Sequence, residues 1–431
     1  MRAAEQRGAW MAVERKHGDE AGLAYRFRAR DGLLGAQMLF VAFGSLVLVP
    51  LLTGLDPNVA LFTAGIGTLV FQIVTRGRVP VFLASSFAFI APIIYGVETW
   101  GIPGTLCGLM AAGGVYMLLS LLIRVRGVGV ITRLLPTIVT GPVIMVIGLV
   151  LAPVAVNLAM GLDGNGNSQL VEPTAAMTVS FVSLAVTVAV SLFGRGFLSL
   201  VPILCGVVAG YLVSLPFGLV DFAPIAAAPW FAVPNFVAPE WNWQAVLFMV
   251  PVAIAPAIEH FGDIVAIRSV TGRDYLKDPG IDRTMLGDGL ATSLAAALGG
   301  PPNTTYSEVT GAVTLTKAYN PALMTWAAGF AIVFAFVGKL GALLASIPTP
   351  VMGGIIVLLF GAIIVVGMNS LAKSEEELTE PRNLAIVGII LVTGVGGLSF
   401  SAGEFALEGI ALAGVLGVVL NLVLPWGRMG R

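Results

Sequence analysis

Two acidic residues stand out because they interrupt a segment that is otherwise almost entirely apolar. The stretch APAIEHFGD carries Glu259 and Asp263, four residues apart and therefore on one face of a helix. Two carboxylates so placed in a medium of low dielectric constant repel each other, and a proton held between them relieves the repulsion. A carboxylate at the centre of a membrane also costs roughly 2.5 to 3.5 kcal/mol on insertion scales. The pair therefore predicts a protonatable site.

A structural explanation stays open for each residue of this stretch. The helix can end here, in which case Glu259 and Asp263 meet the aqueous interface. His260 points about 100° away from Glu259 around a helix. It is either a packed or interfacial histidine or a further contributor to the proton site.

Glu308 lies in a second polar stretch, NTTYSEVTG. Pro301 and Pro302 and the hydroxyl residues that follow them resist an uninterrupted helix and leave backbone N–H groups free. In a membrane, such backbone is tolerated only where it is buried in protein or lines a cavity. Lys317 lies nine residues further on, on the opposite helix face and about 13.5 Å along the axis, so a local ion pair is not expected. We predict that Glu308 belongs to a ligand site, with an interfacial cap of a re-entrant helix as the alternative.

The composition is that of a polytopic membrane protein. Of 431 residues, 57% are hydrophobic, only 11% are charged and 53 are glycine. The net charge of -1 gives no basic field for nucleic acid, and no ATP-binding signature is present. Cys107 and Cys205 both lie in apolar runs, so neither a disulfide nor a metal site is expected. With only two histidines, and no nucleophile or cofactor motif, an enzyme is disfavoured, and no cofactor is expected.

Apolar segments of a length that spans a bilayer predict the topology. About 20 residues are needed to cross ~30 Å of hydrocarbon. Eleven segments qualify, near residues 33–53, 59–75, 104–123, 134–153, 175–193, 197–215, 243–262, 321–338, 350–367, 383–397 and 405–424. Three weaker segments, interrupted by proline, glycine or hydroxyl residues, lie near 80–95, 285–299 and 304–318. Together they predict fourteen spans.

The distribution of basic residues supports this count. With fourteen spans, 22 of the 23 Lys and Arg residues fall in the two tails or in loops after even-numbered spans, and Lys339 is the exception. The positive-inside rule then places both termini in the cytoplasm. Residues 1–30 are too charged for a signal peptide, and we expect a solvated cytoplasmic tail there.

An internal repeat divides the chain into two halves. PTIVTG begins at Pro136 and PTPVMG at Pro348, while SSF at Ser85 is echoed by TTY at Thr304. Seven spans separate the members of each pair, and because seven is odd the halves have opposite orientations. Short, broken segments at matching positions of inverted repeats indicate the central binding site of a transporter.

Several motifs resemble the nucleobase/ascorbate transporter family, also called nucleobase:cation symporter-2, and within it the uracil permeases. NTTYSEVTG is similar to the TTYGEN-type signature of uracil permeases, and the resemblance runs through essentially the whole chain after residue 30. The other similar motifs are SSFAFIAP, AIEHFGD, RGFLSLVPI and KDPGIDRTMLGDGL.

The resemblance implies an all-α fold of two inverted seven-span repeats, with short β-strands in spans 3 and 10. It also implies an elevator-like movement of a core domain against a gate domain, usually in a homodimer. The resulting division is a tail at 1–30, core at 31–126 and 241–346, and gate at 127–240 and 347–431.

The resemblance also implies the roles of individual residues. Glu259 and Glu308 match carboxylates that hydrogen-bond the base, and Phe87 and Ser307 match positions that offer backbone groups. Tyr306, the aromatic residue of the TTY run, is included in the same site.

Four positions depart from the uracil permease pattern. Asp263 stands where His is usual, Ser307 replaces Gly, Val309 replaces Asn, and Met38 stands where His would follow Gln37. An acid at position 263 is similar to the residue that purine-transporting relatives have there. Those relatives tend to have Gln at the position of Glu308, so Glu308 favours uracil.

The expected function is import of uracil coupled to protons across the plasma (inner) membrane. Glu259 would take up the proton with Asp263 as its partner, and His260 and Asp288 are further candidates, although Asp288 in GDGL is interpreted first as a loop acid. A xanthine or uric acid permease is the alternative. A more distant one is an anion transporter of the same fold, disfavoured because the core spans carry acids and no buried Arg.

Overall fold

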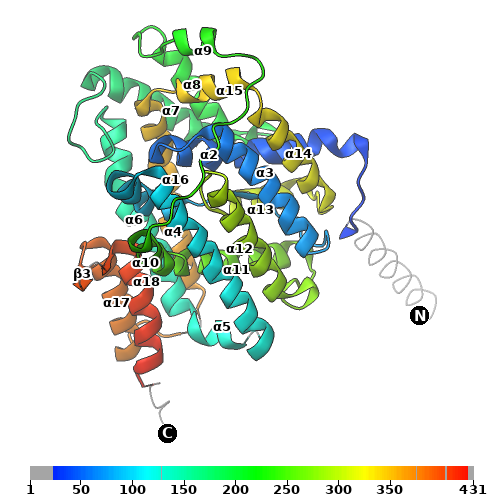
Figure 1. Ribbon diagram of the computed structural model, residues 1–431, viewed down its shortest axis with the longest axis vertical. Helices are drawn as coiled ribbons and strands as arrows, with labels where there is room; N and C mark the ends of the chain where they lie inside the picture. The colour runs from blue at the N-terminus through cyan, green and yellow to red at the C-terminus, as the bar shows by residue number, and fades with distance from the viewer. Residues whose placement is uncertain (1–22, 128, 375, 403–404, 426–431) are drawn as a thin grey trace, which may run out of the picture.

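The computed structural model describes residues 23–127, 129–374, 376–402 and 405–425, and helices dominate them (Figure 1). The helices before residue 300 are η1 (Ala29–Asp31), α2 (Gly32–Thr53), α3 (Pro57–Val74), η2 (Phe87–Phe89), α4 (Ile90–Arg126), α5 (Gly129–Leu134), α6 (Thr137–Ala159), α7 (Pro173–Phe193), η3 (Leu198–Leu200), α8 (Pro202–Ser214), α9 (Ala223–Ala227), α10 (Trp243–Val252), α11 (Ile254–Thr271), η4 (Leu276–Gly280) and α12 (Ile281–Ala297). Those after it are α13 (Ser307–Thr316), α14 (Ala322–Ala335), α15 (Gly338–Ala345), α16 (Thr349–Ala372), α17 (Pro381–Val395) and α18 (Gly409–Val423). The strands are β1 (Leu83–Ser85), β2 (Asn303–Thr305), β3 (Ser399–Ala402) and β4 (Phe405–Glu408).

Seven helical stretches of the described residues are long and apolar enough to cross a membrane. Four shorter apolar helices, α8, α14, α17 and α18, accompany them. The chain is therefore a mostly helical, multi-pass membrane protein, and the count of fourteen spans stays a prediction.

Two of these stretches contain breaks. Gly101, with φ 70° and ψ 174°, divides α4 in two, so the expected span at 104–123 begins just after it. Ala253 separates α10 from α11. The expected span at 243–262 was therefore drawn too short, because α11 continues to Thr271.

Strands β1 and β2 pair antiparallel, with Leu83 opposite Thr305 and Ser85 opposite Asn303. The short strands expected in these two weak segments are thus present. Their backbone groups have no helical partners, and buried side chains complete the hydrogen bonding. Thr292 donates to the Asn303 carbonyl at 2.6 Å, and Thr68 accepts from the Leu83 N–H at 3.0 Å. The pair is fully buried.

The repeated PTxVxG motifs begin two helices, α6 at Thr137 and α16 at Thr349, each with a proline as its N-cap. The two helices pack against each other at glycines. A Cβ atom on Gly367 would lie 2.6 Å from the Gly141 carbonyl oxygen. Small residues at such crossings allow the close backbone approach that membrane helices use for packing.

Replacing Gly367 with Ala is expected to destabilise the protein by about 1 to 3 kcal/mol, because the added methyl group overpacks the α6–α16 contact. Gly361→Ala, on the same helix, is the matched control, because a Cβ atom there meets no other atom within 4 Å. Thermal unfolding of the purified protein in detergent measures both. Equal unfolding temperatures for the two variants would contradict the packing argument.

The chain near residue 400 forms a hairpin that the sequence analysis missed. Strand β3 pairs antiparallel with β4, with Ser399 opposite Glu408. The span expected at 405–424 is therefore wrong at its start, because α18 begins only at Gly409. In SFSA, hydroxyl and apolar residues alternate, a period-two pattern that favours a strand over a helix, whereas FALE shows no such alternation.

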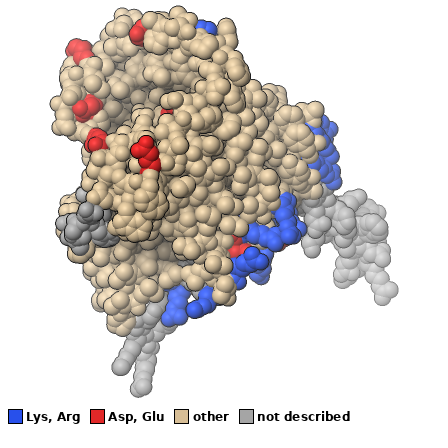
Figure 2. Space-filling model, viewed as in Figure 1, with Lys and Arg blue, Asp and Glu red and all other residues tan. Residues whose placement is uncertain are grey.

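Charged side chains separate by sign. Most Lys and Arg side chains in view gather along one edge of the molecule, and most Asp and Glu side chains lie toward the opposite edge (Figure 2). Lys339, the exception to the charge rule, has local partners. Its Nζ donates to the carbonyls of Ile225 and Ala226 at 2.9 and 3.2 Å, near the C-terminal end of α9, where the helix dipole favours a cation.

The expected solvated tail at 1–30 lies for the most part outside the described residues. Its described end contacts α14, and residues 24–30 are nevertheless exposed. Phe27 stacks on Trp326 with ring centroids 4.6 Å apart, and Trp326 Nε1 donates to the Arg28 carbonyl at 3.1 Å.

Candidate functional site

Two helices, α11 and α13, position the three acids Glu259, Asp263 and Glu308. Helix α11 restarts after the break at Ala253 and carries Glu259 and Asp263 one turn apart. Strand β2 ends at Thr305, and α13 begins two residues later, so Glu308 lies in the first turn of α13. That turn has no side-chain cap, and the first N–H groups of a helix have no intrahelical partner.

The acids share a cavity of about 300 Å³. Phe87, Glu259, Asp263, Tyr306 and Glu308 line it from η2, α11, α13 and the end of β2. The opposite wall comes from α6 and α16 and consists of Ile144, Leu359, Ala362, Ile363, Val366, Asn369 and Ser370. The cavity is therefore largely apolar, with its carboxylates on one side, which is the usual make-up of a small-molecule site.

Aromatic rings border the acids. The ring centroids of Phe87 and Tyr306 are 6.3 Å apart, and Phe360 of α16 approaches Phe87 edge-on at 6.4 Å. A flat ligand between the carboxylates would therefore meet ring surfaces as well as hydrogen-bond acceptors.

Glu308 also lines a second cavity of about 210 Å³. This one lies between α2, α13 and the segment from η3 into α8. Its lining residues are Phe40, Val41, Ser199, Leu200, Val201, Pro202, Ile203, Leu204, Gly311, Ala312 and Leu315. Glu308 thus lies between two cavities, whereas Glu259 and Asp263 line only the first.

The remaining sequence candidates lie elsewhere. Ser307 is the first residue of α13, and its side chain lies outside the described part of the structure. His260 and Asp288 are fully buried behind the acids and do not line the cavity. Met38 is fully buried in α2 and does not line it either.

Two sequence-based interpretations are corrected here. Asp288 is not a loop acid, because it lies within α12 with its side chain completely buried. Asp263 does not sit where its helix meets the interface, because α11 continues for two further turns and Asp263 is only 4% exposed. The GDGL letters misled because two glycines beside an acid are typical of turns.

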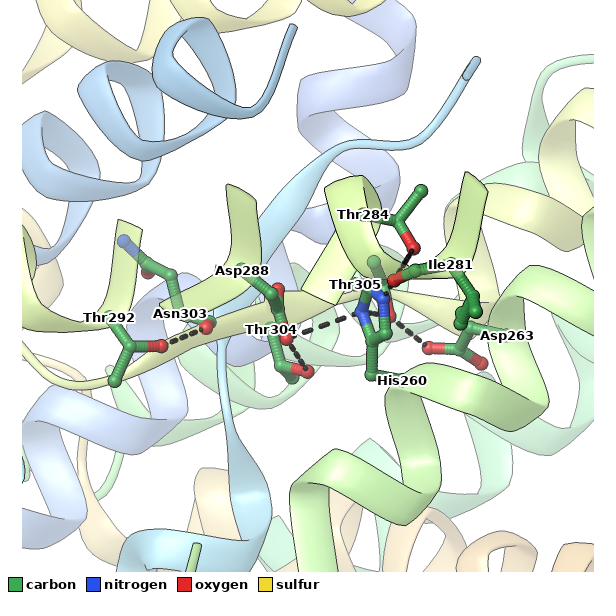
Figure 3. Close-up of polar contacts among 9 residues, drawn as sticks. All are labelled: His260, Asp263, Ile281, Thr284, Asp288, Thr292, Asn303, Thr304 and Thr305. Carbon is green, nitrogen blue, oxygen red and sulfur yellow. Dashed lines mark hydrogen bonds and ion pairs between the residues drawn. The ribbon is translucent and has the colours of Figure 1, made fainter. Parts of the chain in front are cut away.

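A chain of buried hydrogen bonds extends from Asp263 away from the cavity (Figure 3). Thr305 Oγ1 donates to Asp263 Oδ2 at 2.8 Å and lies 3.4 Å from His260 Nδ1. His260 Nδ1 lies 3.3 Å from Asp288 Oδ2. Thr304 Oγ1 donates to the same Asp288 oxygen at 3.3 Å.

The protonation of His260 follows from its neighbours. Thr284 Oγ1 donates to the Ile281 carbonyl at 3.2 Å, so it accepts from His260 Nε2, 3.0 Å away. The other ring nitrogen, Nδ1, then faces the Asp288 carboxylate. Two bare acceptors in a dry interior would repel each other, so a proton lies between Nδ1 and Oδ2. The His260–Asp288 pair therefore shares one proton between Nδ1 and Oδ2, in addition to the one on Nε2.

Sequence reasoning missed the threonines of this chain. In the sequence, Thr304 and Thr305 stand out only as an echo of Ser85 and Ser86, and no motif singles out Thr284. The signal was present, since two hydroxyl residues in a buried strand need hydrogen-bond partners. Which acids they contact depends on how β2 packs against α11 and α12. Sequence motifs do not predict that packing.

Comparison with known proteins shows the family to which the chain belongs. A sequence model of a family described as the permease family matches residues 32–402 of the chain. A probable uracil permease from Pasteurella multocida (strain Pm70) is 53% identical over 397 residues, 92% of this chain and 94% of the relative. The uracil permease of Bacillus subtilis (strain 168) is 45% identical, covering 91% of this chain and 92% of the relative. That of Escherichia coli (strain K12) is 38% identical, covering 90% of each chain.

Solved structures share the fold at low sequence identity. The transmembrane domain of a cyanobacterium bicarbonate transporter, BicA, superposes with a TM-score of 0.65 at 15% identity, covering 93% of this chain and 99% of that one. The murine Solute Carrier 26 family member A9 anion transporter gives 0.65 at 15% identity, covering 93% and 69%. The fold is thus one found among membrane transporters.

Proposed function

Because the chain belongs to the permease family, we propose that it is a symporter that imports uracil together with protons. The observation that carries this proposal is the cavity of about 300 Å³ in which Glu259 and Glu308 meet from two different helices. The names of its relatives, which include uracil permeases across several bacteria, support the substrate. The chain is a transporter and not an enzyme.

The chemistry of uracil suits this cavity. Uracil presents N–H donors beside C=O acceptors along its edge, so it needs acceptors and donors together. Glu259 and Glu308 supply carboxylate acceptors, and the backbone N–H groups at the start of α13, around Ser307, supply donors. Phe87 and Tyr306 offer ring surfaces and, from Phe87, a backbone group. The apolar wall of α6 and α16 keeps water partly away from the edge of the base that makes these hydrogen bonds, which strengthens them.

Protons couple to transport through the acids of α11. Glu259 takes up a proton with Asp263 as its partner, which removes a negative charge from the cavity and strengthens binding of the neutral base. His260 and Asp288 extend the network behind Asp263, since hydrogen bonds through Thr305 connect them. One proton moving through 100 mV is worth about 2.3 kcal/mol, enough for roughly 50-fold accumulation.

Transport follows from movement of the core, residues 31–126 and 241–346, against the gate, residues 127–240 and 347–431. The cavity supports this division, because its acidic wall comes from core elements and its apolar wall from α6 and α16 of the gate. The antiparallel β1–β2 pair fits halves of opposite orientation. In this proposal both termini lie in the cytoplasm, the protein works as a homodimer in the plasma (inner) membrane, and Asn369 and Ser370 mark the inner end of the cavity.

A purine base such as xanthine or uric acid is the second candidate, favoured by Asp263 in place of the usual His. An anion is disfavoured as a substrate, because the residues that line the described cavity include three acids and no Lys or Arg. The fold neighbours named for anions therefore indicate architecture and not substrate.

Radiolabelled uracil uptake into proteoliposomes with an inward proton gradient tests the proposal. Uracil should accumulate, a protonophore should abolish the accumulation, and unlabelled xanthine and uric acid should compete weakly. Displacement by a purine without uracil uptake would move the protein to the purine branch.

A further inference from the structure

We propose that Thr305 is the positioning residue that transmits the charge of Asp263 to the substrate cavity, by holding strand β2 against that acid. The inference rests on the proposed function of proton-coupled uracil transport. It assigns to this threonine a role in coupling that is separate from base binding.

Thr305 connects Asp263 to the start of α13. It is the last residue of β2 and is fully buried, and the next residues along the chain are Tyr306 and, in the first turn of α13, Glu308. Its backbone is held by pairing with Leu83, and its hydroxyl donates to Asp263 Oδ2 at 2.8 Å (Figure 3). A change at Asp263 therefore reaches the start of α13 through one hydrogen bond and two residues of backbone.

The hydrogen bond depends on the charge of Asp263. An ionised carboxylate accepts from the hydroxyl in a short, charge-assisted bond. A protonated carboxyl gives no such charge assistance, so the bond from Thr305 weakens. His260 Nδ1, 3.4 Å from Thr305 Oγ1, can then compete for the threonine proton when the proton between Nδ1 and Oδ2 lies on Asp288.

The second hydroxyl of the strand is tied to the other acid. Thr304 donates to Asp288 Oδ2 at 3.3 Å, so both threonines of β2 attach the strand to carboxylates of the core. Asp288 Oδ1 is buried without a hydrogen-bond partner, which leaves room for a second proton position on that group. The strand is thus attached at its last residue to the cavity acid Asp263 and at its middle residue to Asp288 of the His260–Asp288 pair.

Other ionisable side chains face this chain of hydrogen bonds, and a pH profile contains their effects too. Glu259 lies on α11 with Asp263, Tyr116 faces Asp288 and Glu259 from α4, and Tyr306 and Glu308 lie after β2. The variants must therefore remove the hydroxyl of Thr305 and leave all of these groups in place.

Three variants isolate the hydroxyl. Thr305→Val keeps the shape of the side chain and removes the hydrogen bond, whereas Thr305→Ser keeps the bond. Thr310→Val is the matched control, because Thr310 is 5% exposed, lies in α13 one turn after Tyr306, and its hydroxyl is buried without a hydrogen-bond partner.

Each variant is measured in two ways in proteoliposomes. Uracil counterflow at equal pH on both sides reports binding and movement without net proton transport. Uracil accumulation under an imposed gradient reports coupling. We expect Thr305→Val to retain counterflow but to lose accumulation, from roughly 50-fold at 100 mV to near equality, and to lose the pH dependence of uracil binding. Thr305→Ser and Thr310→Val should behave as the native chain.

The outcomes separate the proposal from the function on which it rests. Absence of uracil counterflow in the native chain contradicts the proposed substrate. Native counterflow and accumulation, with Thr305→Val accumulating uracil normally, overturns the role of Thr305 alone. Loss of counterflow in Thr305→Val also overturns it, because the residue would then support only the fold of the site.

Discussion

Proton-driven accumulation of uracil is expected to disappear when Glu259 is replaced by Gln, falling from roughly 50-fold at 100 mV to near equality. Glutamine keeps an acceptor for the base and is neutral like the protonated acid, but it cannot take up a proton. No gradient energy then reaches the substrate. Uptake of radiolabelled uracil, with and without an imposed proton gradient, measures the loss.

Glu240→Gln is the control for this variant, because Glu240 lies exposed in the segment between α9 and α10 and lines neither site cavity. It should transport as the native chain does. If Glu259→Gln still accumulated uracil against its gradient, the proton would have to bind elsewhere, and Asp263 would be the next group to replace.

Glu308→Gln is expected to separate binding from coupling. Glu308 lines the cavity from α13, which follows strand β2 in the sequence. The threonines of β2, and not Glu308, make the described hydrogen bonds to Asp263 and Asp288. A neutral amide in its place should weaken uracil binding about tenfold, since roughly 1 to 1.5 kcal/mol of charge assistance is lost. Accumulation under a gradient should persist at saturating uracil. Equilibrium binding and accumulation ratios check the two parts.

The same variant also tests the choice of base. The family resemblance gives purine-transporting relatives a Gln at this position, so xanthine should compete better against uracil in Glu308→Gln than in the native chain. Unchanged uracil affinity would remove Glu308 from the site, and lost accumulation would show that it carries the proton.

The sequence was sufficient to predict the acids of the cavity. A carboxylate inside an apolar run is costly and therefore informative, which is why Glu259, Asp263 and Glu308 were identified before the structure placed them around one cavity. The strands at Leu83 and Asn303 are implied by the family resemblance, whereas the residues alone indicate only that prolines and hydroxyl residues interrupt two otherwise apolar segments.

Other features were missed because they depend on packing between distant elements. The residues around Asp288 are typical of a turn. Only its burial in α12 beside His260 identifies it as part of the buried hydrogen-bond chain. The apolar wall from α6 and α16 has no sequence signature that distinguishes cavity-lining residues from lipid-facing ones. Strand β4 falls within the expected span at 405–424 because its residues are mostly apolar and continue into the apolar run of α18.

The most direct test of proton-coupled uracil transport is to follow protons as uracil enters. Purified protein is reconstituted into vesicles that contain a pH-sensitive dye, with equal pH on both sides and the membrane potential clamped at zero, and uracil is added outside. The account predicts acidification of the vesicle interior that requires uracil and is absent in Glu259→Gln. Entry of labelled uracil into the same vesicles without any change in internal pH would contradict it.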